Sequence, residues 1–150
     1  MSLTKLMEDG REEVKLAKKG WEEGSKLVSQ GKFSEAIAIM EKALGAFTEL
    51  GYREDVTGLI NQLGIAYMLS PGKDDPESAL LRSIEYLAEA VDANPVEEYP
   101  DYNAMSYYNL GNAYLNLSQF IHREKNLNRA IGCFKRAVAV WSSDVFHLEP

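Results

Sequence analysis

The chain has 150 residues, a length typical of one domain, and its 45% hydrophobic and 26% charged residues suit a folded protein with a buried core. A formal net charge of -7 argues against a general nucleic-acid-binding or anionic-membrane-binding surface, because such surfaces need clustered lysine and arginine. One cysteine, Cys133, excludes an internal disulfide, and no run of about eighteen apolar residues could span a membrane, so we expect a cytoplasmic protein.

The first predicted helix covers residues 3–30, where apolar residues recur with a helical period. Its early part, 3–19, precedes the repeated part of the chain, and we expect it to extend the helix at its N-terminal end. An apolar stripe on this extension could dock on a neighbour; it consists of Leu6, Met7, Val14 and Ala17.

Five further helices are predicted, at residues 34–49, 55–70, 76–93, 102–119 and 124–142. Between the third and fourth helices, Pro71 and Gly72 stop one helix, and Asp75 as N-cap with Pro76 at the first helical position starts the next. No segment alternates apolar and polar residues with a period of two, so we expect no sheet.

The second, fourth and sixth predicted helices carry one pattern three times. The segments "FSEAIAIMEKAL", "LLRSIEYLAEAV" and "LNRAIGCFKRAV" begin at residues 33, 80 and 127, each 47 residues after the one before. Their apolar columns fall on one stripe of a helix. The aligned columns are Phe33, Leu80 and Leu127; Ile37, Ile84 and Ile131; Met40, Leu87 and Phe134; and Ala43, Ala90 and Ala137. An aromatic column follows, at Tyr52, Tyr99 and Phe146.

The helices that precede these three also repeat. "INQLGIAYML" (60–69) and "YYNLGNAYLN" (107–116) lie 47 residues apart, whereas the first copy, "GWEEGSKLVS" (20–29), lies only 40 residues before the second. The first repeat therefore lacks seven residues between its two helices. Two helical turns take about 7.2 residues, so the longer repeats could contain a helix two turns longer without rotating its apolar face.

These columns resemble the tetratricopeptide repeat, whose first helix carries an aromatic residue, Leu-Gly and Tyr, and whose second carries Ala, an aromatic residue, Ala and a final Pro. The third repeat supplies Tyr107, Leu110, Gly111, Tyr114, Ala130, Phe134 and Ala137, with Ser142 in place of the proline. The second supplies Ile60, Leu63, Gly64, Tyr67, Ser83, Leu87, Ala90 and Pro95. The first repeat matches least in its first helix, at Gly20, Glu23, Gly24 and Leu27. The longer unit resembles those of bacterial, often cyanobacterial, multidomain proteins.

The resemblance implies an all-α fold, a right-handed α-solenoid of three helix-turn-helix repeats with an N-terminal helical extension. We expect a single domain over 1–150, made of the extension 1–17 and the repeats 18–53, 54–100 and 101–150. The small residues Gly24, Gly64 and Gly111 would let the two helices of each repeat approach closely.

The resemblance also implies a non-enzymatic scaffold that binds a protein or peptide segment in a concave groove lined by the first helix of each repeat. The groove candidates are Trp21, Ser25 and Val28 in repeat one, Asn61, Ile65 and Met68 in repeat two, and Met105, Tyr108, Asn112 and Leu115 in repeat three. Aromatic anchors and amides suit an extended peptide or a partner helix. Alternatively, some of these side chains pack against the next repeat, or the N-terminal helix folds into the groove.

Chaperone-binding members of the family hold a C-terminal carboxylate with lysine, arginine and asparagine side chains. The corresponding positions here are Trp21, Ser25, Gln62, Met105 and Asn109, and none of them is basic. A carboxylate would find no cation at these positions, so we expect no binding of this kind.

An alternative function is self-assembly, through the N-terminal helix or through apolar residues of the last helix that no later helix covers, namely Val138, Trp141 and Phe146. An enzyme, a cofactor and a metal site are not predicted. His122 and His147 lack partners at metal-ligand spacing, and Cys133 is better explained as a small packing side chain next to Phe134.

Overall fold

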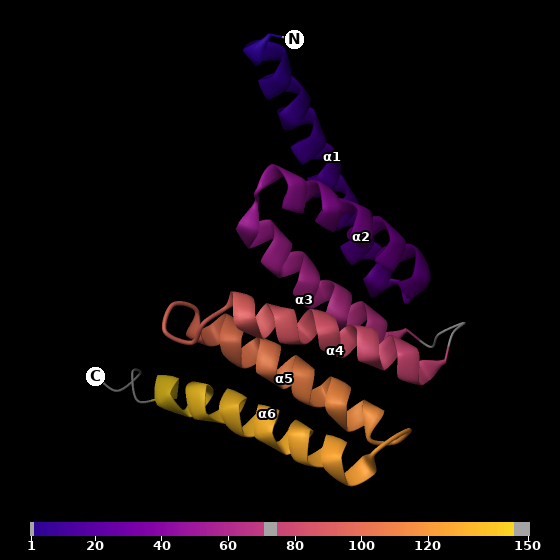
Figure 1. The fold of residues 1–150 in the computed structure, drawn as a ribbon, viewed down its shortest axis with the longest axis vertical. Coiled ribbons are helices and arrows are strands. Elements are labelled where there is room, and N and C mark those ends of the chain that lie inside the picture. Colours follow the sequence, from indigo (N-terminus) through magenta and orange to yellow (C-terminus); the bar gives the residue numbers. More distant parts are fainter. Residues whose placement is uncertain (1, 71–74, 146–150) are drawn as a thin grey trace.

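A computed structural model describes residues 2–70 and 75–145 of the chain, and Figure 1 shows its fold. This part contains six α-helices and no strand: α1 (Leu3–Ser29), α2 (Phe33–Leu50), α3 (Arg53–Leu69), α4 (Pro76–Ala93), α5 (Pro100–Leu117) and α6 (Arg123–Val145). The predicted all-α class is confirmed, and helix ends differ from the predicted ones by three residues or fewer.

The helices stack in chain order down the long axis of the molecule, each against the next (Figure 1). Repeat 1 consists of α1 and α2, repeat 2 of α3 and α4, and repeat 3 of α5 and α6. In the described part of the chain, α1 also contacts α3, and α3 contacts α5, whereas α2, α4 and α6 make no such contacts with one another. The first helices of the repeats therefore lie closer together, and their side of the solenoid is the concave one.

Three glycines mark the places where the two helices of each repeat cross. A Cβ atom on Gly64 would lie 2.5 Å from Cγ of Leu87, and one on Gly111 would lie 2.7 Å from Cε1 of Phe134. A Cβ atom on Gly24 would clash with Met40, the residue that precedes Leu87 and Phe134 in the same repeat column. The predicted role of these glycines in close helix packing is confirmed.

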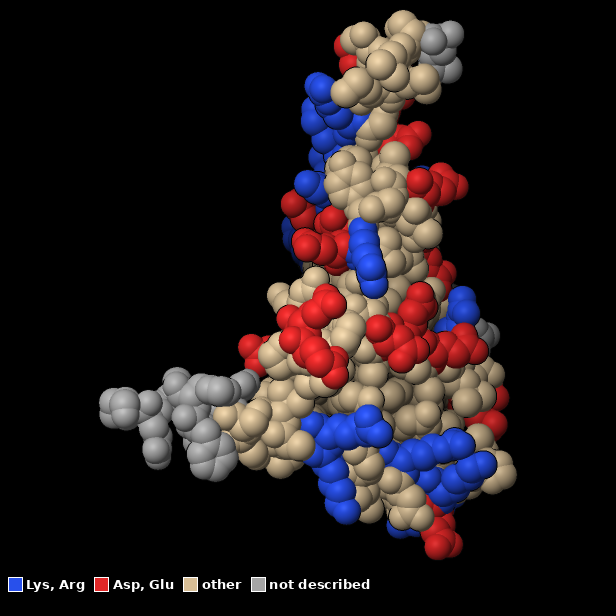
Figure 2. All heavy atoms as spheres, turned by 60° about the vertical axis from the view of Figure 1, so that its left-hand side comes forward, with Lys and Arg blue, Asp and Glu red and all other residues tan. Residues whose placement is uncertain are grey.

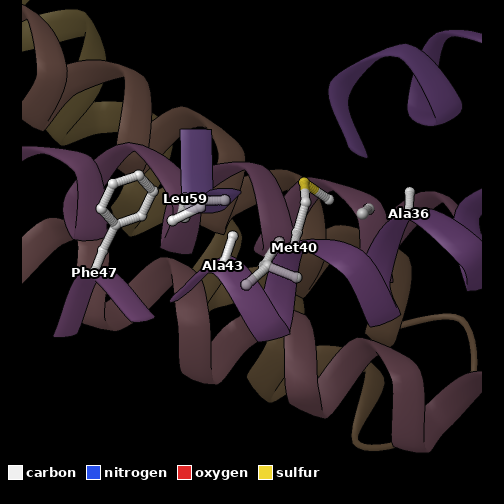
Figure 3. Close-up of a cluster of buried hydrophobic side chains, with 8 residues drawn as sticks. Ala36, Met40, Ala43, Phe47 and Leu59 are labelled. Atoms are coloured by element: carbon white, nitrogen blue, oxygen red, sulfur yellow. The ribbon is translucent and has the colours of Figure 1, made fainter. Parts of the chain in front are cut away.

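The main hydrophobic core lies between repeats 1 and 2. Met40, Ala43 and Phe47 of α2 lie beside Leu59 of α3 in Figure 3, and all four side chains are buried. Burial of a large apolar side chain stabilises the fold by about 1.5–3 kcal/mol. A second, smaller core around Leu87, Leu110 and Ala113 holds repeat 3 on repeat 2.

The seven additional residues of the later repeats do not form the two helical turns that their number permits. The second helix of repeat 1 begins at Phe33, whereas α4 begins four residues before the equivalent Leu80. One extra turn therefore precedes the repeated pattern, and the remaining residues lengthen the connection. Asp75 is the N-cap of α4, as predicted, since its Oδ1 accepts the backbone N–H of Glu77 at 3.2 Å. Pro71 and Gly72 lie outside the described residues.

The predicted extension is confirmed as part of one continuous 27-residue helix. The first half of α1 projects beyond α2 and away from the body of the molecule (Figure 1). Leu3, Leu6 and Met7 are exposed on it, and Ala17 is the first buried residue among those described. The alternative in which this segment folds into the groove is therefore wrong. None of the described helices has the length and apolar character needed to cross a membrane.

Candidate binding groove

A cavity of about 820 Å³ opens on the concave side of the solenoid. Its walls come from α1, α3, α5, the last residue of α4 and the turn between α4 and α5. Three of the ten predicted groove residues line it, one from each repeat: Trp21, Asn61 and Met105. The residues that sequence reasoning did not assign to the groove are Arg53, Glu54, Thr57, Gly58, Gln62, Ala93, Asn94, Pro95, Glu98, Tyr99, Tyr102 and Ser106.

Trp21 joins repeat 1 to repeat 2 on the cavity wall. Its indole N–H donates to Oε1 of Gln62 at 2.9 Å, and its ring meets Phe47 edge-on at 6.2 Å between centroids. The ring also occupies the space beside Gly58, where a Cβ atom would lie 2.7 Å from Cη2 of the indole. Trp21 therefore lines the cavity and also packs against the next repeat. The sequence left these two roles open as alternatives, and both apply at this position.

Amide and hydroxyl groups link the first helices across the concave side. The hydroxyl of Ser25 donates to the same Oε1 of Gln62 at 2.8 Å, which ties α1 to α3. Nδ2 of Asn109 donates to Oδ1 of Asn61 at 3.4 Å, which ties α3 to α5. These bonds fix the orientation of the polar groups that border the cavity.

The remaining candidates of repeats 1 and 2 do not line the cavity. Val28 packs against the first core and Met68 against the second, and Ile65 is half-buried in α3. In repeat 3, Asn112 is half-buried and Leu115 is exposed, and neither borders the cavity. For these five residues the helical spacing did not separate groove positions from packing positions.

Tyr108 lies against the second helix of its own repeat. Its ring centroid is 5.9 Å from that of Phe134 and 5.8 Å from that of Trp141. The structure thus brings together a residue predicted for the groove and a residue predicted for an oligomer interface. Val138 is exposed on the same helix, and Phe146 lies outside the described residues.

Tyr99 and Tyr102 are the aromatic residues of the cavity that sequence reasoning missed. They flank Pro100, the first residue of α5, and both are exposed. Tyr99 belongs to the aromatic column that follows each second helix, which was a usable signal. Tyr102 lies before the repeated pattern of α5 begins, so no repeat column identifies it.

The cavity has mixed and sparse charge. Arg53 is the only cation among the described residues that line it, and Glu54 and Glu98 supply carboxylates. Trp21, Ser25 and Gln62, which stand where a carboxylate clamp would be, are bonded to one another instead. This arrangement supports the prediction that the groove does not bind a C-terminal carboxylate.

The most perturbed ionisable groups lie outside the cavity, between α2, α3 and α4. Oε1 of Glu41 accepts the phenol of Tyr67 at 2.7 Å and that of Tyr86 at 3.2 Å, while Arg82 approaches Glu41 at 3.9 Å. Burial and the neighbouring Glu41 carboxylate raise the pKa of Tyr86 to about 12, and the same causes raise the pKa of Tyr67. These four residues, the Glu41 cluster, join repeat 1 to repeat 2.

Features that would indicate catalysis are weak in the described part of the chain. Burial raises the pKa of the Cys133 thiol, which packs against the second core, so the reactive thiolate is disfavoured. No three His, Cys, Asp or Glu side chains gather there in a way that could hold a metal ion.

Residues 104–139, which are most of α5 and α6, match the family model for the tetratricopeptide repeat. No curated protein matches the chain. Together with the six stacked helices, the family match supports the resemblance stated for the repeat columns, and repeats of this type generally mediate protein–protein interaction.

Proposed function

We propose that this tetratricopeptide-type solenoid is a non-enzymatic scaffold that binds a peptide or protein segment in the groove lined by α1, α3 and α5. The observation that carries the proposal is the cavity of about 820 Å³ on the concave side, to which all three repeats contribute. It has the size of a site for a few amino-acid side chains.

The side chains around the cavity suit an extended, largely uncharged segment. Tyr102 and Met105 are exposed on α5 and offer apolar contact area, and Trp21 forms part of the opposite wall. Asn61 and Gln62 lie between them and carry amide groups that can bond to a peptide backbone. Because Arg53 is balanced by Glu54 and Glu98, we expect aromatic or aliphatic anchors in the partner.

The groove proposal is tested by selecting peptides from a random library on the full chain and measuring their affinity for two variants, Tyr102→Ala and Met105→Ala. Both should weaken binding at least about fivefold, since exposed aromatic and thioether side chains are typical binding anchors. Phe120→Ala is the matched control, because Phe120 is an exposed aromatic outside the cavity. Selected peptides that bind both variants as tightly as the parent chain would show that the groove is not the binding surface.

The domain organisation belongs to the same proposal. We infer a single domain made of the extension 1–17 and repeats over 18–53, 54–100 and 101–150, with kinship to the extended units of bacterial multidomain proteins, and a cytoplasmic location. The unit length of 47 residues and the single cysteine support these inferences.

Self-association through the exposed Val138 and Trp141 of α6 is the second candidate function, and it competes with any other partner for the same residues. Light scattering over a wide range of protein concentrations tests it. A molecular mass that rises with concentration, and returns to that of the monomer in Val138→Asp, would support self-association. A constant monomer mass at several hundred micromolar would exclude a stable assembly.

A further inference from the structure

The last repeat presents a surface that the two earlier repeats cover with a helix. We call it the last stacking face, and it consists of Ile131, Phe134, Lys135, Val138 and Trp141 on α6 together with Tyr108 on α5. The repeat equivalents of its apolar α6 residues in α2 are Ile37, Met40, Leu44 and Phe47. They belong to or pack against the first core, where α3 covers them. In α4, Ile84, Leu87 and Val91 meet α5 in the second core.

Exposure rises sharply along the repeat columns from the earlier repeats to the last one. Phe47 is 0% exposed, whereas Trp141 in the same column is 39% exposed. Leu44 and Val91 are half-buried, whereas Val138 is 56% exposed. The last stacking face therefore has the side chains of a helix–helix interface, and no described helix other than α5 contacts α6.

The aromatic pair at the edge of this face is already formed. Trp21 and Phe47 of repeat 1 lie 6.2 Å apart, and α3 packs over them at Gly58. The equivalent pair of repeat 3, Tyr108 and Trp141, lies 5.8 Å apart and is exposed. A helix that packs as α3 does would bury both rings without a large rearrangement.

The last stacking face differs in charge from the equivalent face of repeat 1. Lys135 stands in the column of Glu41, whose carboxylate accepts the hydroxyl of Tyr67 from the covering helix α3. The side chain that would lie opposite Lys135 therefore occupies the place of Tyr67, four residues after Leu63. A carboxylate at that place would pair with the ammonium group of Lys135.

The surroundings of Lys135 have the same sign. In a chain of net charge -7, α6 carries five basic residues (Arg123, Lys125, Arg129, Lys135 and Arg136) and two acidic ones (Glu124 and Asp144). Figure 2 shows basic side chains gathered at the lower end of the molecule, where α6 lies, below a region rich in acidic side chains. This end attracts acidic partners.

A second copy of the chain fits this face poorly. Two last stacking faces brought together would oppose the basic surfaces of two α6 helices. The outer face of α1 fits no better, because Lys19, Glu23 and Lys26 stand where α3 has the buried Leu59, Leu63 and Ala66. Charged side chains at these three places would be desolvated without partners.

We propose that the last stacking face binds an acidic amphipathic α-helix of another protein. The partner helix lies on α5 and α6 as α3 lies on α1 and α2, with small or apolar side chains at the places of Leu59, Leu63 and Ala66. It presents a carboxylate to Lys135. This site is separate from the groove between α1, α3 and α5 and functions whether or not the groove is occupied.

The probe is a synthetic, helix-stapled peptide with the sequence of Arg53–Leu69 and the change Tyr67→Glu, and its partner probe carries Tyr67→Lys. A staple is needed because isolated helices of this length are marginal in water. Fluorescence anisotropy of the labelled peptides with the full chain should show tighter binding of the Glu peptide, by about two- to fivefold for one exposed charge pair. In the variant Lys135→Glu this preference should reverse.

Two further variants distinguish docking on this face from other binding. Val138→Asp should abolish binding of both peptides, whereas Tyr102→Ala in the groove should leave their affinity unchanged. The proposal would be overturned if the two peptides bound with equal affinity to the parent chain and also to Lys135→Glu. Binding that survives Val138→Asp, or no binding at all, would overturn it as well. Concentration-dependent dimerisation that Val138→Asp abolishes would also overturn it, because a second copy would then be the occupant.

Discussion

At the scale of single residues, the repeat columns predicted packing well. The packing role of the glycine opposite each residue of the Met40 column could be predicted from the sequence, because a small residue recurs where two helices cross. Tyr108 could not be placed in this way. On one helix the groove side and the stacking side differ by about one residue of rotation, and the choice depends on which neighbour is present. That neighbour is a property of the assembled stack.

Gly64→Ala should destabilise the fold by about 1–3 kcal/mol, because a Cβ atom would lie 2.5 Å from Cγ of the fully buried Leu87. Gly45→Ala is the matched control, since Gly45 lies in α2 with open space where its Cβ would be. That change should stabilise the fold by about 0.5–1 kcal/mol through helix propensity. Urea unfolding followed by circular dichroism measures both free energies of unfolding. If Gly64→Ala proved as stable as Gly45→Ala, the close helix crossing at Gly64 would be refuted.

The Glu41 cluster should make the fold sensitive to alkaline pH. The pKa of Tyr86 is raised above its ordinary 10.0 to about 12, so the folded state favours the neutral phenol. This contribution to stability is complete below pH 10 and is lost as the pH rises from 10 to 12. Absorbance titration at alkaline pH should show a late tyrosinate step that becomes smaller in Tyr86→Phe. A titration in which all tyrosines ionise near pH 10 would contradict the cluster.

At the scale of elements, hydrophobic period and turn signals were sufficient to find six helices, and Asp75 with Pro76 fixed the start of α4. The division of the seven extra residues between α4 and the connection before it could not be predicted. Helix length is set by capping and by contacts with the preceding repeat, whereas the repeat columns record only the spacing between packed faces.

The projecting half of α1 should contribute little to stability. Amides of residues 4–12 should exchange hydrogen quickly and those of 17–28 slowly, because burial in α1 begins at Ala17. A chain that begins at residue 13 should keep its melting temperature. A chain that begins at residue 19 should melt lower, since Val14 and Ala17, which pack on the first core, are then missing. Protection throughout 4–12 would show that the extension has a partner.

At the scale of the whole molecule, stability should follow the order of the stack. Among the described residues each repeat contacts only its neighbours, so an interface in the middle supports both ends. The solenoid architecture followed from the 47-residue period, whereas the cavity did not, because Glu98 enters it from the turn between two repeats and Tyr102 from the first turn of α5. Apart from the aromatic column of Tyr99, this part of the chain carries no repeat column that identifies the cavity residues.

Leu63→Ala, which opens a void in the first core, should lower the free energy of unfolding by about 2–5 kcal/mol and weaken protection in all six helices. Phe134→Ala, which truncates a half-buried side chain of α6, should loosen α5 and α6 and leave protection of α1 and α2 nearly unchanged. Hydrogen exchange of both variants measures the difference. Uniform loss of protection in Phe134→Ala would mean that the solenoid unfolds as one unit.

The basic α6 at one end of an acidic chain gives the molecule a permanent electric dipole along its long axis (Figure 2). Such a dipole acts during diffusion, before any contact forms, and turns an approaching acidic protein toward the end that carries α6. The association rate constant with such a partner would therefore fall as ionic strength rises, while the dissociation rate constant, set by the apolar contacts of Val138 and Trp141, would change little.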